Sequence, residues 1–141
     1  MDGVIVLDIF LDVTPTPKAR PRMARSGNVY NTQKTCQAES DIQFLLRAHM
    51  SKESIQITSK PVIVKMRFNY PHPKTMSKND KLLAELEMLY KVSRPDIDNL
   101  AKLVLDSMNG LIYFDDGQVV RLVCEKKYSE REGIDLKVIE I

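Results

Sequence analysis

The segment that decides the architecture runs from residue 94 to residue 118 and reads R94-P-D-I-D-N-L-A-K-L-V-L-D-S-M-N-G-L-I-Y-F-D-D-G-Q118. Leu100, Leu103, Val104 and Ser107 recur at helical spacing, which predicts one amphipathic helix. Asp98 or Asn99 is the expected N-cap, and Asn109-Gly110 is a fitting C-terminal stop. Residues 111–114 are apolar and predict a short strand through which the chain returns.

The segments on both sides of this helix carry strand and helix patterns. Residues 14–34 hold three prolines and lack a hydrophobic period, so they predict an extended loop in which Ser26-Gly27-Asn28 could turn a small hairpin. The element order predicts a single α/β (α+β) domain over residues 1–141, with a mixed β-sheet and helices packed mainly on one face. Strands are expected at 3–12, 61–70, 118–127 and 134–141, and further helices at 35–51 and 77–90.

The composition is that of an ordinary globular protein. The 141 residues suffice for one domain with a real core, and 43% of them are hydrophobic and 28% charged. Two cysteines, Cys36 and Cys124, make neither a disulfide framework nor a zinc ligand set. The N-terminus lacks the basic flank of a signal peptide, and no apolar run is long enough to cross a membrane. The expected compartment is therefore the reducing cytoplasm.

The distribution of charge says more than the net charge of +2. No acid occurs from Val13 to Ala38 or from Ser54 to Asn79, and each run holds five bases. Basic segments beside a local acidic cluster suggest that the bases hold a polyanion such as DNA and that the acids hold a metal. The alternative is that the two runs are solvated faces. The candidate DNA-contacting residues are Lys18, Arg20, Arg22, Arg25, Lys34, Arg67 and Arg94.

Four acids stand in two tight groups around the central helix. Asp96 and Asp98 are two residues apart, so in an extended segment both carboxylates point the same way. Asp115 and Asp116 are adjacent, and neighbours in an extended chain point to opposite faces, so only one of them is expected to reach the same point. The residue pattern leaves that choice open. Because crowded carboxylates repel one another, the cluster predicts a bound cation.

Oxygen ligands without histidine or cysteine select a hard cation, Mg²⁺ or Mn²⁺, as one ion or two. Lys102 lies one turn inside the helix and is expected to point back towards Asp98. There it could stabilise charge on a phosphate or position the attacking water. Asp106 is interpreted as a partner in a solvated ion-pair stripe. Asp98 also has a plainer interpretation as a helix cap.

With these residues in view, residues 94–127 resemble the RusA family of Holliday junction resolvases, small endodeoxyribonucleases common in bacteria and their prophages. The resemblance implies that Asp96, Asp98 and Asp116 bind the catalytic metal and that Lys102 is the essential lysine. It also implies Mg²⁺ dependence, a homodimer, and paired nicks across a four-way DNA junction in recombination and repair. Two symmetric cuts need two active sites, which a C2 dimer supplies.

Two features depart from the family pattern. Residues 71–93 are longer than a compact member requires, and Pro95 separates Arg94 from the first acid. Two other classes of function compete with the nuclease: a non-catalytic DNA-binding or junction-bridging protein, and a metal-stabilised structural domain. The acid set with Lys102 favours the nuclease, because pure binding gains nothing from carboxylates that face phosphates.

Overall fold

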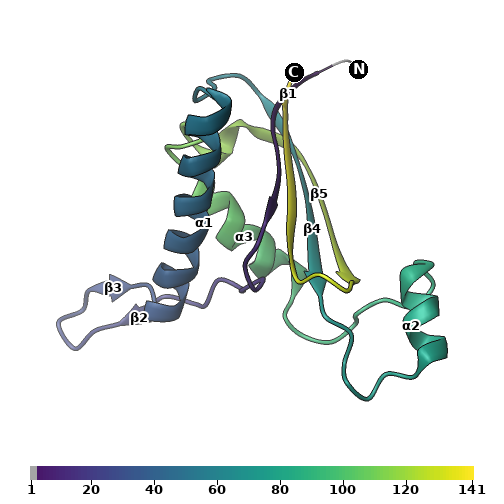
Figure 1. Ribbon diagram of the computed structural model, residues 1–141. Coiled ribbons are helices and arrows are strands. Elements are labelled where there is room, and N and C mark those ends of the chain that lie inside the picture. Colours follow the sequence, from purple (N-terminus) through teal and green to yellow (C-terminus); the bar gives the residue numbers. More distant parts are fainter. Residues whose placement is uncertain (1–2) are drawn as a thin grey trace.

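Four strands form one mixed sheet in the order β1-β6-β4-β5 (Figure 1). The computed structural model describes residues 3–141; residues 1 and 2, which the predicted domain includes, lie outside it. Strand β6 pairs antiparallel with both of its neighbours, whereas β4 and β5 run parallel. The predicted mixed sheet and its strands are confirmed. Their bounds are β1 Val4–Leu11, β4 Val62–Tyr70, β5 Val119–Tyr128 and β6 Gly133–Glu140.

Two helices, α1 (Gln33–Glu53) and α3 (Ile97–Met108), pack on the same face of this sheet (Figure 1). Helix α1 begins where Thr32 Oγ1 accepts a hydrogen bond from the Thr35 amide, and it ends at Ser54 in a left-handed conformation. The alternate strand residues that face the helices are buried, and those on the opposite face are charged or half-exposed. The prediction that helices lie mainly on one face is confirmed.

Helix α3 is anchored firmly to the sheet. Leu100, Leu103 and Val104 are buried in one core cluster with Phe68 of β4. A fully buried aliphatic side chain contributes about 1.5–3 kcal/mol, so these three together fix the axis of the helix. The acids at its N-terminus are consequently carried by a rigid element.

The predicted hairpin in the proline-rich loop is present as a two-stranded ribbon of its own. Strand β2 (Arg22–Met23) pairs antiparallel with β3 (Val29–Tyr30). Gly27 in the connecting turn has a φ of 88°, a conformation that side chains with a Cβ rarely adopt. Figure 1 shows this ribbon extending away from the body of the molecule at one end of α1.

Two sequence predictions are wrong in detail. Residues 111–114 form a turn rather than a strand: Ile112 and Tyr113 are fully buried, and Tyr113 makes only isolated bridges, to Thr58 and Asn109. The helix expected at 77–90 is shorter: α2 spans Lys78–Glu85, and Glu87 has a positive φ of 59°. Only one of its residues is buried, so little packing is available to extend it.

Within residues 3–141, none of the helices combines the length and the apolar character that crossing a bilayer requires.

Candidate functional site

The two acids of the D-x-D sequence lie where α3 begins. Asp96 is the N-cap residue and Asp98 lies in the first turn, so the helix starts two or three residues earlier than the predicted cap at Asp98 or Asn99. Asp98 is therefore helical. The prediction that Asp96 and Asp98 point the same way assumed an extended segment, so it is wrong about the backbone at Asp98. Asp98 Oδ1 accepts a hydrogen bond from the Asn99 amide at 2.9 Å, whereas the carboxylate of Asp96 makes no capping bond. Both side chains are exposed.

The chain that enters α3 is held from two sides. Lys126 Nζ of β5 donates hydrogen bonds to the carbonyl oxygens of Ser93 at 2.8 Å and Pro95 at 3.0 Å. From the proline-rich loop, the amide of Lys18 donates to the carbonyl oxygen of Asn99 at 2.9 Å. These bonds fix the backbone immediately before and after the two acids.

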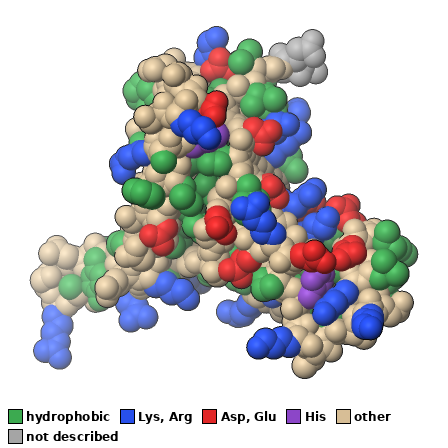
Figure 2. All heavy atoms as spheres, in the orientation of Figure 1, with side chains coloured by type: hydrophobic (Ala, Val, Ile, Leu, Met, Phe, Trp, Pro, Cys, Tyr) green, Lys and Arg blue, Asp and Glu red, His purple; other side chains and the backbone are tan. Residues whose placement is uncertain are grey.

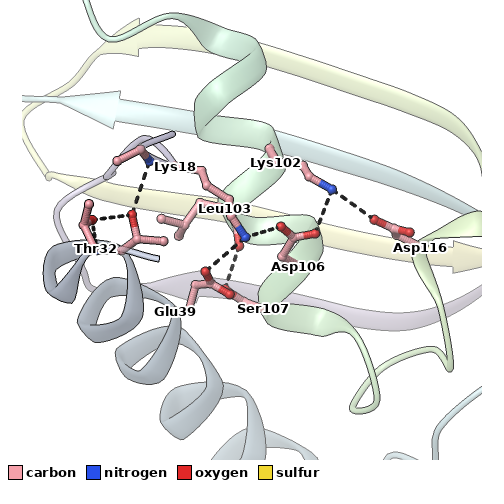
Figure 3. A network of polar contacts seen from close by, with 10 residues as sticks. Lys18, Thr32, Glu39, Lys102, Leu103, Asp106, Ser107 and Asp116 are labelled. Carbon is pink, nitrogen blue, oxygen red and sulfur yellow. Dashed lines mark hydrogen bonds and ion pairs between the residues drawn. The ribbon is translucent and has the colours of Figure 1, made fainter. Parts of the chain in front are cut away.

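Lys102 points towards Asp106 and Asp116 rather than towards Asp98 (Figure 3). Its Nζ lies 3.0 Å from Asp106 Oδ1 and 3.7 Å from Asp116 Oδ2. The hydrogen bond to Asp106, aided by the charges of both acids, raises the pKa of Lys102 above its ordinary value despite some desolvation. The ammonium therefore stays charged at neutral pH and lies between Asp106 and Asp116.

Asp106 is the centre of a polar chain that crosses the site. It lies 2.6 Å from Lys18 Nζ as well as 3.0 Å from Lys102 Nζ, and its side chain is only 14% exposed. Burial alone would raise the pKa of Asp106, but hydrogen bonds from the two lysines outweigh it and hold that pKa below its ordinary value. The predicted pair with Lys102 is confirmed. The expected solvated setting is wrong, because Lys18, which also contacts Glu39, covers the carboxylate.

The turn at residues 114–118 separates the roles of the second pair of acids. Asp115 Oδ2 accepts a hydrogen bond from the Gly117 amide at 2.9 Å and so caps the short 3₁₀ helix Asp116–Gln118. Gln118 holds this turn against the segment before β4, since its Nε2 donates to the carbonyl oxygens of Thr58 and Lys60. Asp115 is therefore occupied by the turn, and Asp116 is directed to Lys102.

A groove of about 480 Å³ joins the proline-rich loop to the D-x-D sequence. Lys34 lies on its loop side, and Arg94, Asp96 and Asn99 line its other side. Figure 2 shows Lys and Arg side chains along the lower edge of the molecule, from the projecting ribbon across to the region of α2. The groove thus brings cationic groups and a carboxylate that caps nothing into one solvent-open space.

Comparison with known proteins identifies the family. A family model described as "Endodeoxyribonuclease RusA" matches residues 12–139. The chain belongs to the RusA family. It is 32% identical over 130 residues to the uncharacterized protein YqaN of Bacillus subtilis (strain 168), which covers 90% of this chain and 91% of that protein. A shorter match of 53 residues, 42% identical, is to the crossover junction endodeoxyribonuclease rusA of Lactococcus phage r1t and covers 37% of this chain and 40% of that protein.

The acids of this RusA-family chain have the donor chemistry that a hard divalent cation requires. Within the described residues, however, no three acidic, histidine or cysteine side chains are grouped closely enough to hold a metal by themselves. Mg²⁺ usually keeps several waters and takes one or two carboxylates together with substrate phosphates. Asp96 and Asp98 beside the groove fit a site of that kind, which DNA would complete. The three-carboxylate set with Asp116 stays a prediction.

The predicted DNA-contacting residues of this RusA-family member fall into two groups. Lys18 is engaged with Glu39 and Asp106, and Arg67 is paired with Glu125 across the neighbouring strands. The others are exposed and take part in no ion pair among residues 3–141; they are Arg20, Arg22, Arg25, Lys34 and Arg94.

Sequence patterns do not single out two residues that organise the site. From the sequence, Asp106 is predicted to be a solvated surface residue. Gln118 is noted only as the last residue of the segment 94–118. For Asp106 the available signal is its spacing of four residues from Lys102 on a helix with a buried face. For Gln118 the signal is an amide directly after two acids, where it can satisfy several backbone groups of a tight turn at once.

Proposed function

We propose that this RusA-family endodeoxyribonuclease resolves four-way DNA junctions by paired symmetric nicks, and that it does so as a Mg²⁺-dependent homodimer, with Mn²⁺ as an alternative ion. The observation that carries the proposal is the groove that Lys34 and Arg94 line together with Asp96. Cationic walls attract a phosphodiester, and a carboxylate in the same space has a use there only if a cation accompanies the phosphate. The phage relative's name points to the same substrate.

Asp96, Asp98 and Asp116 are the proposed metal-holding residues. Bound Mg²⁺ supplies Lewis-acid stabilisation of charge on a phosphate oxygen. The first turn of α3 adds the positive end of a helix dipole next to the same space. The hydrogen bonds from Lys126 to the preceding carbonyls hold Asp96 in place as the DNA enters.

Lys102 is the proposed stabiliser of the charge that develops on the scissile phosphate. Its raised pKa keeps it protonated, and Asp106 restricts where the ammonium can lie. Asp116 is close enough to Lys102 to draw it towards the proposed metal site. A positioned charge of this kind accelerates the reaction because it needs no reorganisation when the phosphate charge appears.

The exposed bases are the proposed DNA contacts: Arg20, Arg22, Arg25, Lys34 and Arg94, with Arg67 reaching a phosphate if it leaves Glu125. Lys18 is assigned a different task. Because its ammonium is engaged with Glu39 and Asp106, it ties the basic loop to α3 and contributes to DNA binding through that connection. The proposed homodimer follows from the chemistry, since one chain carries one site and symmetric resolution requires two cuts.

The test is cleavage of a synthetic four-way junction in the presence of Mg²⁺, comparing the wild type with Asp98→Asn. We expect the variant to bind the junction normally and to lose cleavage by about 10²-fold or more, because the loss of one carboxylate weakens the proposed metal site. Asp115→Asn is the matched control. Asparagine also caps well, so that variant should fold and cut nearly as the wild type does. Wild-type rates of cleavage by Asp98→Asn would refute the site.

A non-catalytic junction-binding protein is the second candidate. It is favoured by one observation, the absence of a ready-made three-acid metal group among residues 3–141. The same assay separates the two candidates, because the non-catalytic protein would bind the junction and leave it uncut at every Mg²⁺ and Mn²⁺ concentration.

A further inference from the structure

The basic ribbon, residues 20–30, has two chemically different faces. Arg22 lies opposite Tyr30 and Met23 lies opposite Val29 in its antiparallel register. Directly opposed residues share a face and successive residues alternate, so Arg22 and Tyr30 form one face and Met23 and Val29 form the other. The ribbon is closed by hydrogen bonds from the amide of Ala24 to Asn28 and from that of Gly27 to Ala24.

The apolar face of the ribbon is open to solvent. Met23 is 72% exposed and Val29 is 65% exposed, although neither belongs to the core. Figure 1 shows the ribbon projecting from the body, and Figure 2 shows basic side chains along its lower side. An arm that only gripped phosphates would gain nothing from an aliphatic pair in water, where polar side chains are more soluble.

We propose that the ribbon enters the branch point of the DNA junction, where Met23 and Val29 pack against the exposed face of a base pair while Arg22 and Arg25 hold the flanking phosphates. This inference rests on the proposed function and adds the means by which the protein selects a branched substrate. The partner is indicated by charge, because a protein segment with arginines and no acid from Val13 to Ala38 matches a polyanion.

Selectivity follows from the cost of exposing a base. Proteins that insert apolar side chains between stacked base pairs must first unstack them, which opposes insertion into a regular duplex. At an open four-way junction the base pairs around the branch lack a stacked neighbour on one side. The same aliphatic contact is therefore made there without that cost, so the apolar face favours the junction whereas the arginines favour any DNA.

The experiment uses a four-way junction with 2-aminopurine beside the branch point, and a duplex of the same sequence, in EDTA to prevent cleavage. Binding of the wild type should change the 2-aminopurine fluorescence of the junction and not that of the duplex. The double variant Met23→Ser with Val29→Ser should lose most of this change, and its junction-over-duplex affinity ratio should fall by about tenfold. Arg22→Ala should weaken binding to both DNAs and leave the ratio near its wild-type value.

The matched control removes two aliphatic side chains from the opposite end of the molecule. Val4 and Ile5 of β1 are 64% and 55% exposed, and Figure 1 places the start of β1 far from the ribbon. Val4→Ser with Ile5→Ser should leave the fluorescence change and the affinity ratio unaltered. Because Met23 and Val29 lie outside the core, the ribbon double variant should also keep the wild-type melting temperature, which excludes unfolding as the cause.

Three outcomes overturn the inference. One is an unchanged fluorescence signal and affinity ratio in the ribbon double variant. Another is an equal loss in the β1 control. The third is a shift in oligomeric state on sedimentation without a change in DNA selectivity, which would assign the apolar face to a second copy of the chain. Failure of the proposed function is separate, because it would appear as absent Mg²⁺-dependent cleavage by the wild type.

Discussion

The acidic site and the basic ribbon differ in how their side chains are held. At the site, Lys102 and Asp106 are restrained by ion pairs, and the backbone around Asp96 is restrained by Lys126 and Lys18. On the ribbon, arginines and aliphatic residues alike are exposed, with only the hairpin's own bonds behind them. Catalysis on a phosphate requires charges held in fixed positions. A segment that has to fit a branched DNA can instead use conformational mobility.

The largest effect is expected at Lys102, whose ammonium is restrained while the ribbon side chains are exposed. Lys102→Met should reduce the cleavage rate of a junction by about 10²–10³-fold, because it removes a fixed positive charge next to the reacting phosphate. Junction affinity, measured by fluorescence anisotropy, should change little. Lys52→Met, which alters an exposed lysine in the last turn of α1, is the control and should cut normally. A loss of affinity that accounts for the whole effect would show that Lys102 grips DNA as the ribbon does.

A smaller effect is expected when Asp106, which restrains Lys102, is replaced and the charge of Lys102 is kept. Asp106→Asn should lower kcat by about tenfold with little change in KM, since a misplaced catalytic group costs rate rather than binding. Loss of the two charged hydrogen bonds should also lower the free energy of unfolding by about 1.5–3 kcal/mol.

Lys18→Met separates positioning by Asp106 from simple stability. It removes the other partner of Asp106 and leaves Lys102 in place, so it should destabilise the fold while kcat stays near that of the wild type. If both variants lowered kcat equally, Asp106 would act through the fold alone and the restrained character of the site would not matter for the chemistry.

The ribbon arginines should affect binding without affecting the cut. Arg22→Ala and Arg25→Ala should each weaken DNA affinity severalfold and reduce the slope of log K against log salt by about 0.9 for each phosphate that the variant no longer touches. Cleavage rates at saturating protein should remain close to wild type. An unchanged salt slope would mean that these side chains are solvated and reach no phosphate.

The smallest effect concerns acid stability. The pKa of Asp106 lies below its ordinary value of 3.8 in the folded protein, so its ionised form stabilises the fold above that value and this contribution is lost as pH falls through the lowered pKa. Urea midpoints should therefore drop more in the wild type than in Asp106→Asn as the pH falls below the ordinary carboxyl pKa of 3.8. Parallel curves for the two proteins would contradict the ion-pair account.

The elements that obey a strong period are predictable from sequence. The alternation in Val62–Tyr70 and the helical spacing of buried residues in Ile97–Met108 follow from one buried face each. Both elements are located within a few residues. Residues 111–114 are misassigned because a short apolar run fits a buried turn as well as a strand.

The sequence predicts which residues belong to the site, but it does not predict which of their side chains contact one another. Asp106 resembles a surface residue in the sequence because its second partner, Lys18, lies 88 residues away along the chain. Local spacing cannot reveal such a partner. The same limit explains why the sequence places Lys102 beside Asp98: helical spacing allows that neighbour and Asp106 equally, and the tertiary position of Asp116 decides between them.

The insertion between β4 and α3 is fastened at both ends to the same strand. Tyr70 at the end of β4 accepts a hydrogen bond from the Ser129 amide just beyond β5, and Lys126 of β5 holds the carbonyls of Ser93 and Pro95. Residues 71–92 therefore connect two anchor points that stay a fixed distance apart, and between them the segment contacts the sheet through the ion pair of Glu87 with Lys127. We expect that a reporter peptide can replace the exposed part of this segment and leave Asp96 where it is.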